Sequence, residues 1–279
     1  MMKIIKNISE MRIEAVKLRK NKKSVGFVPT MGALHEGHIS LVRRSKKTAD
    51  RTVVSIFVNP IQFSPSEDLS KYPKPIKNDI KILEREGVEA LFMPSSDEMY
   101  RERETSVLNN ASSHILCGKT RKNHFEGVLT VVAKLFNIVT PDFSFFGEKD
   151  YQQLMLIRKM ADDLNFNIKI IGCPIVRESD GLALSSRNAY LTPEERRESP
   201  VIYNTLLLAA KLFKEGVSIS EIERISKKTI GKNSKGKTEY VKIYGNNLEE
   251  CDLRSRRCRI FAAVRFKSAR LIDNMEVRR

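Results

Sequence analysis

Two histidines three residues apart, His35 and His38, are the clearest candidates for chemistry in this sequence. They follow a turn at residues 29–32 that contains a proline and a glycine, and they precede a basic stretch at residues 40–49 that is typical of a helix. At a helix start this spacing places both imidazoles on one face, beside the backbone N–H groups and dipole that attract a phosphate. We therefore expect the pair to stabilise charge on a phosphate, with His38 closest to the helix start and the better donor. The structural alternative is that one histidine caps the helix and the other is merely exposed.

Three further segments carry polar side chains suited to anionic ligands. The amide of Gln62 can donate to a hydroxyl or a carboxylate without neutralising its charge. Lys149 offers a compact cation for a phosphate, and Asp150 can cap the next helix or accept from a ribose hydroxyl. Residues 185–187, Ser-Ser-Arg, place two hydroxyls and a guanidinium in one loop, which suits a triphosphate. A plain turn is the alternative for the segment that contains Lys149.

Alternating strands and helices are expected to position these groups. Apolar runs typical of buried strands lie at residues 25–28, 52–58, 89–93, 143–146 and 167–171, and helical patterns lie at residues 9–21, 76–86 and 127–139. The alternation predicts an α/β protein with a Rossmann-like, doubly wound parallel sheet. Ligands of such sheets bind beyond the carboxyl ends of the strands, where residues 31–38 and 59–63 would lie. Residues 59–75, rich in proline, serine and aspartate, are expected to form a loop.

The character of the chain changes from Thr192 onward. Helical patterns at residues 193–214 and 218–230 precede two strand patterns, at residues 239–244 and 259–266. We predict a catalytic domain at residues 1–176 and a smaller C-terminal α+β domain, with a possible role as a lid, at residues 177–279.

Composition narrows the class of protein. The 279 residues are 41% hydrophobic and 30% charged, as in ordinary water-soluble proteins. No apolar run approaches the roughly 18 residues of a membrane helix, and the N-terminus lacks a signal-peptide pattern, so a cytoplasmic protein without a membrane is expected. The net charge of +16 is spread over many predicted helix faces. We interpret it as a solvated basic surface and expect no nucleic acid partner.

The four cysteines carry no recognisable pattern. Their positions show neither CxxC spacing nor a neighbouring histidine cluster, which argues against a zinc site and against a disulfide framework. Buried or inert thiols are therefore expected at all four positions.

Several segments together resemble a known family. MGALHEGH after an apolar strand resembles the HIGH motif of adenylyl-transferring enzymes. With FVNPIQF, FFGEKDYQQL, Ser-Ser-Arg and RLIDN, the chain is similar to the pantothenate synthetases, the ATP-dependent pantoate–β-alanine ligases. The resemblance runs from about residue 25 to residue 274 and is densest before residue 190.

The resemblance implies a role for each matching residue. ATP would be bound by Met31, Gly32, His35, His38, Gly147, Glu148, Lys149, Asp150, Val176, Leu184, Ser185, Ser186 and Arg187. Of these, His38, His35, Lys149 and Arg187 would be catalytic. Pantoate would be bound by Gln62, Gln153, His124 and Arg121, and β-alanine by Gln62. His124 could alternatively be only the first residue of a helix, and Leu184 departs from the methionine of the family. No protein ligand for a metal is expected, Mg²⁺ would come with ATP, and the family implies a homodimer.

The resemblance further implies the condensation of (R)-pantoate with β-alanine through a pantoyl adenylate, giving pantothenate, AMP and diphosphate. Two rival hypotheses remain. One is a nucleotidyltransferase that stops at the adenylated or cytidylated product. Gln62 and Gln153, in a pocket sized for a branched hydroxy acid, count against it. The other is a non-catalytic nucleic-acid-binding module, favoured only by the +16 charge.

Overall fold

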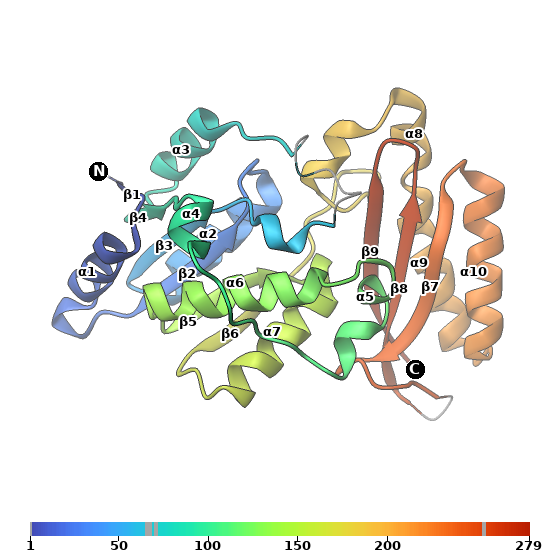
Figure 1. Ribbon diagram of the computed structural model, residues 1–279. Coiled ribbons are helices and arrows are strands. Elements are labelled where there is room, and N and C mark those ends of the chain that lie inside the picture. Colours follow the sequence, from blue (N-terminus) through green and yellow to red (C-terminus); the bar gives the residue numbers. More distant parts are fainter. Residues whose placement is uncertain (1, 65–68, 70–71, 253–254) are drawn as a thin grey trace. The chain divides into compact units, whose positions relative to one another are not determined.

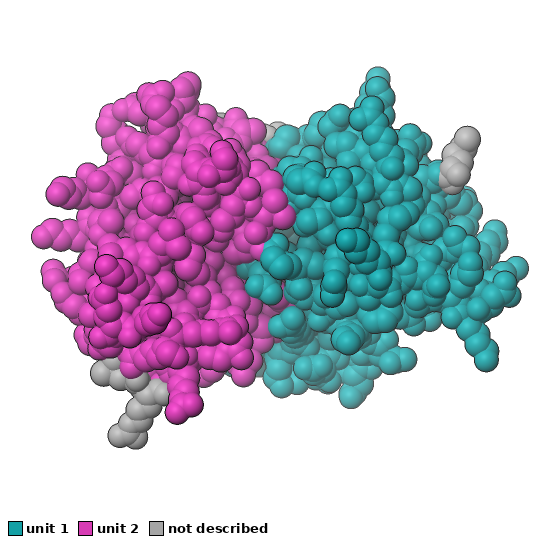
Figure 2. All heavy atoms as spheres, turned by 180° about the vertical axis from the view of Figure 1, so that it is seen from behind, with its two compact units in different colours: residues 1–148, 156–174 teal, residues 149–155, 175–279 magenta. Residues whose placement is uncertain are grey.

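The computed structural model describes residues 2–64, 69, 72–252 and 255–279. Their contacts divide the chain into two compact units, shown in different colours in Figure 2. Unit 1 comprises Met1–Glu148 and Leu156–Pro174, and unit 2 comprises Lys149–Met155 and Ile175–Arg279. The predicted domain boundary at residues 176–177 differs from this division chiefly at the short segment Lys149–Met155.

Unit 1 is built on a parallel β-sheet. Its strands are β1 (Lys3–Ile5), β2 (Val25–Thr30), β3 (Arg51–Ile56), β4 (Ala90–Phe92), β5 (Phe143–Gly147) and β6 (Lys169–Cys173). They lie in the order β1-β4-β3-β2-β5-β6, and every neighbouring pair is parallel. From β2 the chain moves outward through β3 and β4, then returns to the other side of β2 for β5 and β6. This confirms the predicted doubly wound α/β class and makes the end of β2 the topological switch point, where such sheets bind their ligands.

Helices cover the sheet of unit 1. They are α1 (Ile8–Leu18), α2 (Glu36–Thr48), α3 (Ile76–Arg85), α4 (Ser96–Tyr100), α5 (Cys117–Thr120) and α6 (His124–Val139), and α7 (Tyr151–Asp163) begins in unit 2 and continues into unit 1. Right-handed crossovers place helices on opposite faces when the winding direction reverses at β2. Accordingly α6, which contacts α1, crosses the face of the sheet nearest the viewer in Figure 1. Side chains of α2 and α3 share the other core with Val28, Val54 and Phe145.

Unit 2 is the smaller α+β unit that the sequence predicts. Its strands β7 (Lys237–Gly245), β8 (Arg257–Arg265) and β9 (Arg270–Arg278) form an antiparallel sheet in the order β7-β8-β9. Its helices are α8 (Pro193–Glu198), α9 (Val201–Lys214) and α10 (Ile219–Asn233). The helix expected at residues 193–214 is interrupted because Pro200 has no N–H to donate, and the Ser199 hydroxyl instead donates to the Arg196 carbonyl at 2.9 Å.

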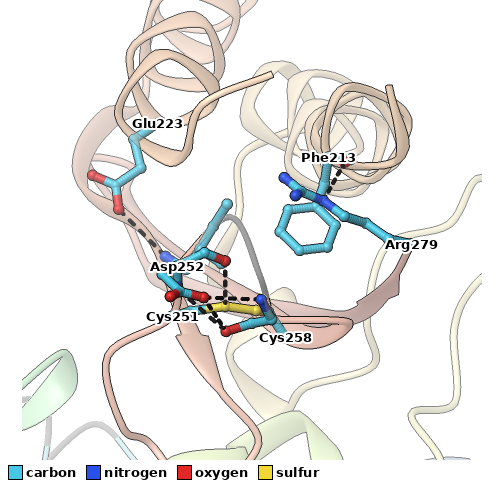
Figure 3. The surroundings of a disulfide bond; sticks show 8 residues. Phe213, Glu223, Cys251, Asp252, Cys258 and Arg279 are labelled. Carbon is cyan, nitrogen blue, oxygen red and sulfur yellow. Dashed lines mark hydrogen bonds between the residues drawn. A yellow bond between two sulfur atoms is a disulfide. The ribbon is translucent and has the colours of Figure 1, made fainter. Parts of the chain in front are cut away.

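The expectation of four unpaired cysteines is wrong for two of them. Cys251 and Cys258 form a disulfide across the connection between β7 and β8 (Figure 3). Cys258 lies opposite Gly245 in the β7–β8 pairing, and an isolated antiparallel bridge joins Glu250 to Tyr244, so both cysteines lie beside the end of β7 without any CxxC spacing. Cys117 and Cys173 are buried and lie outside any disulfide, as expected.

Two remaining sequence predictions concern loops and membranes. Of the predicted loop at residues 59–75, the positions 65–68, 70 and 71 lie outside the described residues. Within the described part of the chain, no helix is both long and apolar enough to span a bilayer.

Candidate functional site

The turn after β2 is held by a buried carboxylate. Gly32 and Ala33 both have positive φ values, of 81° and 51°. Asp79 of α3 is fully buried and accepts from the N–H groups of Ala33 and Leu34, both at 2.9 Å. Burial raises the pKa of Asp79, and the two backbone donors oppose that shift. A side chain at Gly32 would be strained by the positive φ and would place its Cβ 3.1 Å from the Asp79 carboxylate. Asp79 therefore fixes the backbone that leads to the histidine pair.

The two histidines form a reciprocal cap at the start of α2. His35 is the N-cap residue, and its Nδ1 accepts from the N–H of Gly37 at 3.2 Å. The Nδ1 of His38, at the third helical position, accepts from the N–H of His35 at 3.4 Å. The ring centroids are 4.1 Å apart. The structure thus brings the pair together, but the expectation that His38 lies closest to the helix start is wrong, because His35 is the cap.

These caps define which ring nitrogen carries the hydrogen. A backbone N–H can only donate, so Nδ1 of each ring must accept. In the neutral form the hydrogen then lies on Nε2, which makes both His35 and His38 donors at that atom. Helix capping and donation to a phosphate are therefore compatible roles for these histidines, because the cap at Nδ1 places the hydrogen on Nε2.

Gln62 lies in a network of neutral polar groups at the end of β3. Its Oε1 accepts from the Asn59 amide at 3.1 Å, and its Nε2 lies 2.9 Å from the Met31 sulfur. The Tyr100 hydroxyl donates to the Asn59 Oδ1 at 2.7 Å, and burial raises the pKa of that hydroxyl. Gln62 is thus oriented by its neighbours, and Tyr100 is a contributor that no sequence motif indicated.

His124 and Arg121 join the same network from the start of α6. His124 is buried, its Nδ1 lies 2.9 Å from the Gln62 carbonyl oxygen, and its Nε2 lies 2.7 Å from the Arg121 guanidinium. The close packing of α6 against the backbone of residues 61 and 62 depends on Gly127, where a Cβ would lie 2.6 Å from the Ile61 carbonyl oxygen. The structure therefore brings Gln62, His124 and Arg121 together, and it also makes His124 the first residue of its helix.

The Ser-Ser-Arg segment in unit 2 is folded on a narrow turn. Leu184 donates its N–H to the Val176 carbonyl at 3.0 Å, which pairs two of the predicted nucleotide contacts. The Ser185 hydroxyl oxygen accepts from the Arg187 N–H at 3.3 Å and caps a short 3₁₀ helix, Ser186–Tyr190. The predicted phosphate ligands of this segment are therefore adjacent and held by local bonds.

The Gly-Glu-Lys-Asp segment crosses from one unit to the other. Gly147 and Glu148 belong to unit 1, whereas Lys149 and Asp150 belong to unit 2 and approach each other to 3.8 Å between Nζ and Oδ2. A Cβ at Gly147 would meet no atom of the described chain within 4 Å, so protein packing does not require the glycine there. Gln153 follows in the first turn of α7.

The predicted site residues are distributed over the two units as follows. Unit 1 carries Met31, Gly32, His35, His38, Gln62, Arg121, His124, Gly147 and Glu148, and unit 2 carries Lys149, Asp150, Gln153, Val176, Leu184, Ser185, Ser186 and Arg187.

The fold and the geometry of the site together define the class of this protein. A doubly wound parallel sheet with a tautomer-defined histidine pair at its switch point is a Rossmann-like α/β protein of the nucleotide-binding type. Comparison with known proteins gives the family. The sequence profile of the pantoate–β-alanine ligases matches residues 3–276, and the chain belongs to this family.

Known pantothenate synthetases are similar to this chain over nearly its full length. The chain is 48% identical to the pantothenate synthetase of Caldicellulosiruptor bescii, covering 99% of each chain, and 48% identical to that of Thermotoga petrophila, covering 98% of this chain and 99% of the other. Its structure is similar to the crystal structure of pantothenate synthetase from Thermus thermophilus, with a TM-score of 0.93 and 41% identity over 100% of both chains. It is also similar to the pantoate–β-alanine ligase of Francisella tularensis complexed with β-γ ATP and β-alanine, with a TM-score of 0.83 and 37% identity over 99% and 97% of the chains.

Proposed function

We propose that this protein condenses pantoate with β-alanine at the expense of ATP, through a pantoyl adenylate, and releases pantothenate, AMP and diphosphate. The family match over residues 3–276 supports the choice of substrates. The observation that carries the chemistry is the histidine pair at the start of α2, whose caps leave an Nε2–H donor on each ring.

The first half-reaction makes the carboxylate reactive. A carboxylate oxygen of pantoate attacks the α-phosphorus of ATP, and the bond from that phosphorus to diphosphate breaks. Negative charge that develops on the phosphate oxygens is stabilised by preorganised donors. In this proposal the donors are His35, His38, Lys149 and Arg187, with the Ser185 and Ser186 hydroxyls. Met31, Gly32, Gly147, Glu148, Asp150, Val176 and Leu184 complete the ATP contacts.

The second half-reaction forms the amide. The amine of β-alanine attacks the activated carbonyl carbon, the bond to AMP breaks, and the nitrogen loses a proton. In this proposal Gln62 orients both pantoate and β-alanine, and Gln153 orients pantoate. The contacts from Asn59 and Met31 to the Gln62 amide support this role, because they hold a neutral amide in one orientation. Arg121, whose guanidinium contacts Nε2 of His124, supplies positive charge for the pantoate carboxylate.

A divalent cation is expected to arrive with ATP, and we propose Mg²⁺. This ion prefers oxygen ligands, keeps several waters and commonly binds through substrate phosphates. No protein ligand is assigned to the ion. Bound to the phosphates of ATP, Mg²⁺ would neutralise part of the charge that the protein donors also face.

Assembly and compartment are also proposals. We propose a homodimer that works in the cytoplasm, where ATP is supplied. Light scattering of the purified protein tests the first point, because a mass near that of one 31.9 kDa chain at micromolar concentration would contradict it.

Isotope exchange tests the proposed reaction. Pantoate alone, without β-alanine, should support exchange of labelled diphosphate into ATP, because the adenylate forms reversibly before the amine reacts. Addition of β-alanine should then yield pantothenate and AMP. Exchange that strictly requires β-alanine would remove the free adenylate from the mechanism. Formation of adenylate with no amide product would favour a nucleotidyltransferase that stops at the adenylated product.

The high positive charge allows one further check. If the surface is only solvated, duplex nucleic acid should bind weakly, and its affinity should fall steeply with salt. Tight and salt-resistant binding to a defined RNA would bring the nucleic-acid-binding alternative forward.

A further inference from the structure

Two neighbouring polar side chains on β9 have no role in the reaction as described so far. Asp273 and Asn274 are only 4% and 2% exposed. Buried polar groups require partners, because an unsatisfied one is costly. Here the partners belong to the two segments of unit 2 that carry the proposed phosphate ligands.

Asn274 holds the backbone at Lys149. The Arg259 guanidinium donates to Oδ1 of Asn274 at 2.5 Å, and Nδ2 of Asn274 donates to the Lys149 carbonyl at 2.9 Å. A guanidinium only donates and a carbonyl only accepts, so the orientation of the amide between them is unambiguous. Arg259 is itself buried and stacks over the Tyr151 ring at 3.7 Å, while the Tyr151 hydroxyl donates to the Asn246 carbonyl at 3.1 Å. The chain on both sides of Asp150 is therefore tied to the sheet of unit 2.

Asp273 holds the other segment. Its two carboxylate oxygens accept from Arg177 at 2.6 and 2.9 Å, and the same guanidinium donates to the Gly181 carbonyl at 3.0 Å. This bidentate pair fixes the narrow turn on which Val176 faces Leu184. Burial raises the pKa of Asp273, whereas Arg177 and the charge of Lys149 act to lower it. The carboxylate therefore also interacts electrostatically with the Lys149 ammonium.

We propose that Asp273 and Asn274 are a positioning pair, which holds the Lys149 segment and the Ser-Ser-Arg segment in register so that their cations meet the phosphates of ATP together. Neither residue touches the substrate in this account. The inference rests on the proposed function, since it concerns the placement of the phosphate ligands of that reaction.

The sharpest variant is Asn274→Asp. It keeps the shape of the side chain and the contact to Arg259, but it replaces the donor that faces the Lys149 carbonyl with an acceptor. A displacement of about 1 Å at a reacting group can reduce the rate on the order of 10²-fold. We therefore expect single-turnover adenylation at saturating ATP to slow by about that factor, whereas amide formation from preformed pantoyl adenylate changes by less than about threefold.

Asn233→Asp is the matched control. The Asn233 amide also donates to a backbone carbonyl, that of Thr229 at 2.8 Å, but it is exposed at the end of α10 and contacts neither phosphate segment. This variant should adenylate at the wild-type rate. If Asn274→Asp does not fold, as judged by circular dichroism, Arg259→Lys decides the question, because it keeps a positive charge and loses the stacking on Tyr151. It should slow adenylation selectively, by about tenfold.

The outcomes separate the two proposals. A wild-type protein without pantoate-dependent diphosphate exchange would overturn the proposed function itself. An active wild type whose folded Asn274→Asp or Arg259→Lys variant adenylates like Asn233→Asp would overturn the positioning pair alone. Equal slowing of both half-reactions would likewise overturn it, since it would indicate general structural damage. Selective loss of adenylation supports it.

Discussion

Replacement of His38 by three different residues separates the two tasks that the structure gives its ring. Nδ1 accepts from the His35 N–H at 3.4 Å, and the hydrogen on Nε2 is proposed to face the phosphate. The oxygen of an asparagine side chain can occupy the place of Nδ1, and the amide nitrogen of a glutamine can reach the place of Nε2. His38→Asn therefore keeps the cap and removes the donor, His38→Gln keeps a donor and weakens the cap, and His38→Ala loses both.

The expected magnitudes differ enough to be resolved. Removal of one preorganised donor to transition-state charge slows the chemical step by about 10²–10³-fold, which corresponds to about 2.7–4 kcal/mol. Loss of one intramolecular hydrogen bond lowers the free energy of unfolding by about 0.5–1.5 kcal/mol. We expect His38→Asn to adenylate as slowly as His38→Ala while unfolding like the wild type. His38→Gln should retain more of the adenylation rate and show the stability loss.

Single-turnover measurements of each half-reaction at saturating ATP, together with thermal unfolding, provide the test. Amide formation from preformed pantoyl adenylate involves a carbonyl centre and should change much less than adenylation. Equal slowing of both half-reactions by His38→Ala would contradict the assigned role. Unchanged adenylation in His38→Ala would exclude it.

Three other substitutions test structural features of the two units. Asp79→Asn keeps the side-chain shape but turns an amide donor toward one of the two backbone N–H groups. The free energy of unfolding should therefore fall by about 1–3 kcal/mol, and adenylation should slow. Wild-type values for both quantities would refute the role of Asp79 in the turn. Gly127→Ala should lower stability by about 1–3 kcal/mol and raise the KM for pantoate, because its Cβ would lie 2.7 Å from the backbone of Gln62. The control Gly231→Ala, in α10 with open space at the Cβ, should stabilise the protein slightly. Cys258→Ser should lower the free energy of unfolding by about 2–3 kcal/mol, an effect that reduction of the wild type should reproduce.

The sequence predicted the parts of the fold whose signals are local. β2, β3 and β5 are apolar runs buried on both faces, and each lies within a few residues of its predicted position. β1 was missed because its apolar run is only Ile4 and Ile5 between two lysines, whereas the equally short β4 is apolar and buried throughout. β9 was missed because its buried positions include Asp273 and Asn274, so the alternation of apolar and polar residues that marks a strand is broken there.

The residues of the candidate site likewise fall into two groups, those in a continuous sequence motif and those placed by tertiary contacts. The histidine pair and the Ser-Ser-Arg segment are continuous motifs, so their residue types, their spacing and the family resemblance together indicated them. Asp79 holds Ala33 from 46 residues away, and Asn274 holds Lys149 from 125 residues away. Such partners depend on which strands and helices become neighbours, and no local pattern in one sequence contains that information.

Three of the four histidines of unit 1, His35, His38 and His124, illustrate how this tertiary context decides chemistry. His35 and His38 each accept a backbone N–H at Nδ1, which places the hydrogen on Nε2. His124 contacts the Arg121 guanidinium at Nε2, so this nitrogen must accept and Nδ1 donates to the Gln62 carbonyl. One residue type is thereby fixed in two opposite tautomers within one unit. In the proposed site, His124 is thus an acceptor that supports the Arg121 guanidinium, whereas His35 and His38 would supply their own Nε2 hydrogens.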